Sequence, residues 1–108
     1  MECLTPDNLD TFVEAVNKFL STTPVDRYLD NVFYGTDMVT VRKADLGGVM
    51  GVTFEGGGMS NSIAAFDEAS PHRTEFELEP SVGHLAIYYY PAGEQRSVFG
   101  YVRHLQAR

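Results

Sequence analysis

The segment Leu85-Ala86-Ile87-Tyr88-Tyr89-Tyr90-Pro91 decides the fold, because every residue before the proline is apolar or aromatic. Side chains alternate between the two faces of a β-strand, so both faces of this strand carry large apolar or aromatic groups. A strand of this kind needs a cover on each side. One amphipathic helix covers only one face, so we expect something else to cover the second.

The helix that covers the first face is predicted near the N-terminus. Its start is indicated by Thr5-Pro6-Asp7, where a capping side chain adjoins a proline that the first helical turn tolerates. Apolar residues then recur at helical spacing, at Leu9, Phe12, Val13, Val16 and Leu20, and the polar residues Asp10, Glu14, Asn17 and Lys18 are expected to face water. After Pro24, apolar residues at helical intervals as far as Phe33 predict a second, short helix.

After the helices the apolar period changes from helical to alternating. Turns are predicted at Asp45-Leu46-Gly47-Gly48 and at Gly56-Gly57-Gly58, where glycine tolerates a positive φ. Between them, Met50, Val52 and Phe54 are expected to face the core. The predicted strands cover 38–43, 49–55, 59–66, 74–79, 85–90 and 97–103. A helix followed by about five or six antiparallel strands is an α+β arrangement, and we expect one curved antiparallel sheet with the N-terminal helix packed on it.

Length and composition narrow the class of protein. At 108 residues the chain has the size of one domain, spanning 1–108. A net charge of −7 disfavours binding to nucleic acid or to an anionic membrane surface. Cys3 is the only cysteine, so an intrachain disulfide and a cysteine zinc cluster are excluded. The sequence shows no secretory leader and no apolar run of membrane-spanning length, which is typical of a cytoplasmic protein.

Four aromatic residues are candidates for a binding surface. If Leu85, Ile87, Val98 and Val102 face the helix, the aromatic residues that point away from it on neighbouring strands are Tyr88, Tyr90, Phe99 and Tyr101. Exposed contiguous aromatic surface usually marks an interface. The alternative is that a strongly curled sheet, or the segment 59–73, encloses this face and makes it part of the core.

A row of acidic residues is predicted beside the aromatic patch. Glu75, Glu77 and Glu79 share one face of a single strand, and like charges at this spacing repel each other, which favours a basic partner. A solvated face that discourages edge pairing is the commoner explanation. A third explanation is that cations of the same chain neutralise the row. These cations follow the last acidic residue in the sequence and are Arg96, Arg103, His104 and Arg108.

No motif in the sequence identifies a reaction. The histidines, His72, His84 and His104, are far apart in sequence and match no metal-ligand spacing. We therefore expect no metal site, no cofactor and no catalytic residues, and we expect His72 to be exposed in a loop. A nucleophile assembled in space from Cys3 or a serine with one of the histidines stays open as an alternative.

The predicted helix over Asp7–Leu20 and the segment Gly48-Val49-Met50-Gly51-Val52-Thr53-Phe54-Glu55-Gly56-Gly57 resemble small cytoplasmic immunity proteins that neutralise bacterial polymorphic toxins. The tryptophan common in several such families is absent, and no helix pattern follows Tyr101, so no functional residue is carried over. The resemblance implies an acidic, single-domain inhibitor that binds a toxin and catalyses no reaction. A phage-encoded antagonist of a host nuclease has the same sequence character.

The sequence thus predicts a non-enzymatic inhibitor that binds a basic protein, such as a toxin or a defence nuclease, through an acidic and aromatic surface. One alternative is a curled sheet whose interior binds a small molecule, with tyrosines lining the pocket and His84 as acid or base. Another is a homodimer that pairs the open sheet faces of two copies.

Overall fold

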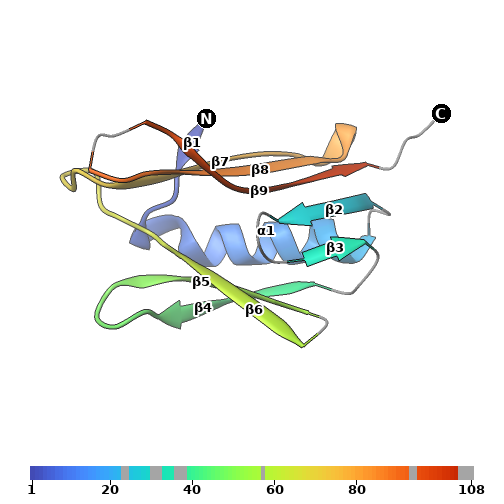
Figure 1. Ribbon diagram of the computed structural model, residues 1–108, viewed down its shortest axis with the longest axis horizontal. Coiled ribbons are helices and arrows are strands. Elements are labelled where there is room, and N and C mark those ends of the chain that lie inside the picture. The colour runs from blue at the N-terminus through green and yellow to red at the C-terminus, as the bar shows by residue number, and fades with distance from the viewer. Residues whose placement is uncertain (23–24, 30–32, 36–38, 57, 93–94, 105–108) are drawn as a thin grey trace.

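Turn residues divide the chain into one long helix and a series of strands (Figure 1). The computed structural model describes residues 1–22, 25–29, 33–35, 39–56, 58–92 and 95–104, and for Thr22, Met59, 25–29, 33–35 and 101–104 it describes the backbone alone. The helix α1 spans Leu9–Thr22 and follows a 3-10 turn over Pro6–Asn8. The strands are β1 (Glu2–Cys3), β2 (Val25–Leu29), β3 (Phe33–Gly35), β4 (Thr40–Asp45), β5 (Met50–Gly56), β6 (Met59–Ala64), β7 (Arg73–Glu79), β8 (His84–Tyr90) and β9 (Ser97–His104).

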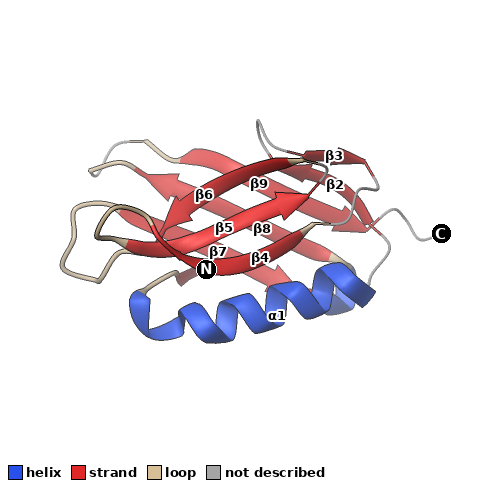
Figure 2. Ribbon diagram, turned by 90° about the horizontal axis from the view of Figure 1, so that it is seen from below, coloured by secondary structure: helices blue, strands red, loops and turns tan. Residues whose placement is uncertain are grey.

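The strands form two antiparallel sheets. The larger sheet has the order β1-β7-β8-β9-β2-β3, and the smaller has the order β4-β5-β6. The two sheets lie on opposite sides of the core, and α1 runs along one flank between them (Figures 1 and 2). The predicted α+β class and the N-terminal helix are confirmed, whereas the expected single sheet is divided into two.

The helix predicted after Pro24 is wrong, because this part of the chain contains β2 and β3. Their backbones pair with each other, Leu29 opposite Phe33, and β2 extends the larger sheet by pairing with β9, Arg27 opposite Val102. Helical apolar spacing over so short a segment does not distinguish a helix from a strand. The β-branched and aromatic residues here also suit a strand, and β9 provides an edge to which the backbone can bond.

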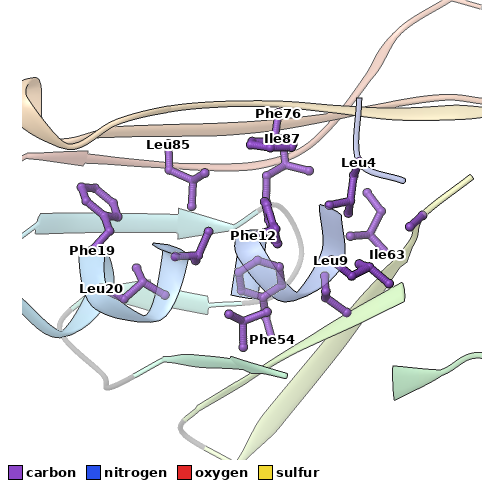
Figure 3. Close-up of a cluster of buried hydrophobic side chains, with 14 of the residues drawn as sticks. Leu4, Leu9, Phe12, Phe19, Leu20, Phe54, Ile63, Phe76, Leu85 and Ile87 are labelled. Carbon is purple, nitrogen blue, oxygen red and sulfur yellow. The ribbon is translucent and has the colours of Figure 1, made fainter. Parts of the chain in front are cut away.

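The core lies between the two sheets and α1 (Figure 3). Leu85 and Ile87 of β8 are fully buried, as expected of the inner face of the tyrosine strand, and each stabilises the fold by about 1.5–3 kcal/mol through burial. Phe12 of α1 packs edge-on against Phe76 of β7, with ring centroids 4.8 Å apart. Phe54 of β5 is fully buried on the opposite side of the core. The inner face of β8 is therefore covered by both the helix and the smaller sheet.

In the smaller sheet, a tight turn at the predicted glycines connects β4 to β5. Gly47 and Gly48 both have positive φ, +80° and +97°, and the Gly48 amide donates to the Asp45 carboxylate at 2.7 Å. The expectation for Met50 is wrong, because its side chain is 36% exposed, whereas Val52 is buried as predicted. Met50 opens β5 directly after this turn, opposite Asp45, which places it beyond the end of the core.

Asn17 connects α1 to β4 and does not face water as expected. Its Nδ2 donates to the Val41 carbonyl at 2.8 Å, and the Val41 N–H donates to its Oδ1 at 2.9 Å. A second link, between Lys43 Nζ and Asp10 Oδ1 at 3.1 Å, lies nearby and is exposed. These contacts hold the helix along the edge of the smaller sheet.

No helix in the described ranges is long and apolar enough to cross a membrane.

Candidate functional site

The candidate site is the outer side of the larger sheet, the side that faces away from α1 and the smaller sheet. Register fixes its composition, since directly opposed residues of antiparallel strands share a face. Glu75 lies opposite Tyr88, Glu77 opposite Ala86, and Glu79 opposite His84. We call this surface the outer face; its residues are Arg73, Glu75, Glu77, Glu79, His84, Ala86, Tyr88, Tyr90 and Val98.

The predicted acidic row is present on β7. Thr74 and Phe76 point inward and are buried, so the intervening Glu75 and Glu77 lie on the outer face. In Figure 1, α1 and the smaller sheet both lie on the other side of β7 and β8. The segment 59–64, which was a candidate cover for the tyrosines, forms β6 of the smaller sheet instead.

Phe99 does not share the outer face with the tyrosines as predicted. The β8–β9 register shifts between Ile87 and Tyr88, so that Ile87 pairs with Gly100 but Tyr88 pairs with Val98. This bulge turns Phe99 inward, where its ring lies 5.7 Å from that of Phe54. The inward position expected for Val98 is wrong for the same reason, because Val98 takes the outward position beside Tyr88 and is 44% exposed.

Tyr88 and Tyr90 both lie on the outer face and are half-buried. The backbone of Tyr101 pairs with Ala86, and the side chain of Tyr101 lies outside the described part of the chain. Two of the four predicted aromatic residues are thus placed together, one is turned inward, and the interface role of all four stays a prediction.

Two arginines stack on the tyrosines of the outer face. The Arg73 guanidinium lies 3.9 Å from the centre of the Tyr90 ring, and that of Arg96 lies 4.3 Å from the centre of the Tyr88 ring. Arg73 Nε also donates to Glu75 Oε2 at 2.6 Å. The hydrogen bond to Glu75 raises the pKa of Arg73 above its usual value. One arginine therefore links an acidic and an aromatic side chain into a preordered group.

The sequence analysis missed Arg73, although its spacing from Glu75 was a usable signal, because residues two apart on a strand share a face. Arg96 was one of the cations offered as a means of neutralising the acidic row, but among the described contacts it lies over Tyr88. Arg103 is the backbone partner of His84 on β9.

The other end of the outer face brings a histidine to two glutamates. His84 Nε2 lies 3.0 Å from Glu77 Oε1, and the ligand atoms of Glu77, Glu79 and His84 all lie within 4.8 Å of one another. Within the described residues, Glu79 has no ion pair of its own. Ligand spacing along one segment does not reveal this cluster, because the Glu-x-Glu pair meets the histidine only across the β7–β8 hairpin. These three residues could hold a metal ion.

A hollow lies between the sheets on the flank opposite α1. It has a volume of about 420 Å³, and its lining is mainly apolar; it includes Leu46, Ile63, Phe66, Tyr89 and Phe99. His72 is half-buried beside it, which differs from the exposed position expected. Its ring stacks on Phe66 with centroids 5.4 Å apart, and its Nδ1 accepts the Ala92 N–H at 3.0 Å. The Tyr89 hydroxyl lies 3.3 Å from the same nitrogen. His84, the predicted acid or base of a pocket, does not line this hollow.

Comparison of the chain with models of known protein families, with curated proteins and with solved structures finds no match. The resemblance to immunity proteins accordingly stays a prediction. The geometry of the outer face is the basis for inferring a function.

Proposed function

We propose that this chain is a non-enzymatic, protein-binding inhibitor that uses the outer face to bind a basic protein, such as a toxin or a defence nuclease. The observation that carries the proposal is the juxtaposition of half-exposed Tyr88 and Tyr90, stacked arginines and a row of three glutamates on one side of a sheet. The other side of that sheet already has its cover, so these residues are not needed to complete the core.

The tyrosines supply the apolar part of such a contact. Tyrosine buries a large area while few of its bonds become fixed, and its hydroxyl can bond a partner. Arg73 and Arg96 restrict the rings further, because each guanidinium lies on one of them. A surface ordered before binding loses less conformational entropy in the complex. Val98 extends the same patch by an exposed apolar side chain.

The charges favour a basic partner over an acidic one. The chain carries 15 acidic residues and 8 lysines and arginines. On the outer face, Glu75 is paired with Arg73 and Glu77 lies beside His84, whereas Glu79 has no ion pair among the side chains that the structure describes. A locally negative surface steers a positively charged protein during encounter and repels acidic competitors.

A photo-crosslinking amino acid at position 88 tests where a partner binds. The control carries the same amino acid at position 14, because Glu14 is exposed on α1, outside the outer face. In the cells that make the protein, position 88 should give an adduct with one basic protein, and position 14 should not. An adduct of the chain with itself at position 88 would support the homodimer instead and overturn the proposal, as would the absence of any adduct.

The purified partner then allows the energetic test. Tyr88→Ser should weaken binding by about thirtyfold, the effect of removing an interface residue worth about 2 kcal/mol. Val49→Ser is the control, because Val49 is exposed before β5 in the smaller sheet and should leave binding unchanged. Circular dichroism of Tyr88→Ser should match the wild type. If the substitution unfolds the chain, Tyr88 belongs to the core and the proposal fails.

The salt dependence of the association rate tests whether the acidic row steers the partner. The association rate should fall when ionic strength rises from about 0.01 M to about 0.15 M, where the screening length shortens from about 30 Å to about 8 Å. Replacing both Glu77 and Glu79 with glutamine should flatten this dependence more than Glu14→Gln together with Asp7→Asn, which removes equal charge from exposed positions of the N-terminal helical segment. A rate that does not depend on salt would remove the steering role from the acidic row.

One observation favours a second candidate function, the binding of a small apolar molecule. The hollow of about 420 Å³ has Tyr89, Phe66 and Phe99 in its lining. Its size and apolar lining suit a small ligand. Binding of the probe anilinonaphthalene sulfonate, with fluorescence that Ile63→Phe abolishes and Tyr88→Ser leaves intact, would support this function. Unchanged fluorescence in Ile63→Phe would exclude the hollow as the probe's site.

A further inference from the structure

We propose that Glu77, Glu79 and His84 bind a divalent transition-metal ion, and that the ligand set suits Zn²⁺. The inference concerns the hairpin end of β7 and β8 and does not depend on the outer face binding a protein. It starts from geometry, because the potential ligand atoms of the three side chains lie within 4.8 Å of one another.

The backbone holds the three residues in place. Glu79 and His84 are the last directly opposed pair of the β7–β8 ladder, and Glu77 lies two residues earlier on the same face. The strands are joined by a 3-10 turn over Pro80–Val82, in which the Gly83 N–H donates to the Pro80 carbonyl at 3.1 Å. Gly83 has a φ of 68°, in the left-handed region that glycine adopts without strain. The ligands thus come from paired strands with a short, hydrogen-bonded connection.

The distances are close to those of a tetrahedral site. With metal–ligand bonds of about 2.1 Å, neighbouring ligand atoms of a tetrahedral zinc lie about 3.4 Å apart. His84 Nε2 and Glu77 Oε1 are already 3.0 Å apart. Glu79 is exposed, so its flexible side chain can approach this pair at little cost in packing. Three protein ligands leave the fourth position of a tetrahedral ion open to water.

The charge of the cluster also favours a cation. Two carboxylates two residues apart on one strand face repel each other, and an ion between them converts that repulsion into attraction. The imidazole selects the kind of ion: a nitrogen ligand suits Zn²⁺ and other late first-row metals, whereas Mg²⁺ and Ca²⁺ prefer sites made of oxygen alone. Arg103, the backbone partner of His84 on β9, is the cation that register places next to the cluster.

Calorimetric titration of the full, untagged, chelator-treated chain with ZnCl₂ tests the site. We expect one equivalent of Zn²⁺ to bind saturably, MgCl₂ not to compete, and ethylenediaminetetraacetate to reverse the binding. Zinc should also raise the thermal unfolding midpoint, because an ion that binds only the folded chain stabilises it. No saturable uptake of zinc by the wild type would overturn the proposal.

Variants assign the binding to these residues. His84→Gln and Glu77→Gln should each weaken zinc binding at least about tenfold, since the loss of a group that merely orients a ligand already costs ten- to a hundredfold. Glu75→Gln is the matched control, on the same strand and face but outside the cluster, and should bind like the wild type. Arg103→Gln should bind at least as tightly. Equal binding by His84→Gln, or an equal loss in Glu75→Gln, would contradict the assignment, with circular dichroism confirming that each variant is folded.

Discussion

At the scale of single residues, Asn17 shows how one amide replaces a strand. β4 is an edge strand of the smaller sheet, so a backbone that faced α1 would have no neighbouring strand to bond. The Asn17 side chain supplies one donor and one acceptor, at 2.8 and 2.9 Å from the two backbone groups of Val41. The helix is thereby joined to β4 by the same pair of bonds that a further strand would make.

Asn17→Ala should lower the free energy of unfolding by about 2 kcal/mol, because it leaves two backbone groups of Val41 without their partner. Urea denaturation measures the change. Glu14→Ala, an exposed substitution on the same helix, should stay within about 0.5 kcal/mol of the wild type. If the two variants were equally stable, Asn17 would not be a structural link.

The sequence pattern predicted the face on which a side chain lies where that face depends on a single strand. The alternation of Thr74 to Glu79 was sufficient to place the three glutamates on one face, because no bulge interrupts β7. The inward position of Leu85 and Ile87 followed for the same reason. Asn17 has no such signal, since a polar residue between apolar ones on a helix usually faces water.

At the level of strands, the bulge between β8 and β9 determines which of Val98 and Phe99 faces the core, which the sequence pattern does not determine. Val98 and Phe99 are both apolar, so either can face the core without changing the sequence pattern. One extra residue in β9 exchanged their sides. The pairs Arg73–Tyr90 and Glu79–His84 depend on register between strands, which local periodicity does not specify. Most of the candidate site therefore became visible only when the strands were paired.

The close packing of β5 against β6 gives a prediction for an element. A Cβ at Gly51 would collide with the Ile63 carbonyl oxygen and would lie 2.9 Å from Ala64 Cα, both backbone atoms of β6. Gly51→Ala should therefore destabilise the fold by about 3 kcal/mol, as overpacking of a rigid neighbour does.

Gly58→Ala is the control for that substitution. Its Cβ would meet nothing within 4 Å, but Gly58 has a φ of +79°. The left-handed backbone alone should cost about 1 kcal/mol. Thermal or urea unfolding of both variants gives the comparison, and a Gly51→Ala protein as stable as Gly58→Ala would show that β5 and β6 are not so closely apposed.

At the scale of the whole molecule, the two sheets and the helix explain the tyrosine strand. The inner face of β8 is covered by α1 and the smaller sheet. On the outer face, Tyr88 and Tyr90 of β8 lie beside the acidic row of β7. A symmetric dimer through the outer face would bring the glutamates of both copies to one interface. Their repulsion disfavours self-association, which leaves a different, basic protein as the proposed cover.

Sedimentation equilibrium of the isolated chain should give a single species of 12.0 kDa. The mass should stay constant up to about 100 µM, well above the Kd of a specific micromolar complex. A species of twice this mass that Tyr88→Ser converts to monomer would instead show that the outer face binds a second copy.

Nuclear magnetic resonance cross-saturation from the unlabelled partner, identified by crosslinking, to the labelled chain shows which residues of the chain the partner covers. We predict the strongest transfer at β7, β8 and Val98, with little at β4, β5 and β6. Strongest transfer at α1 or the smaller sheet would contradict the account, because the partner would then bind away from the outer face.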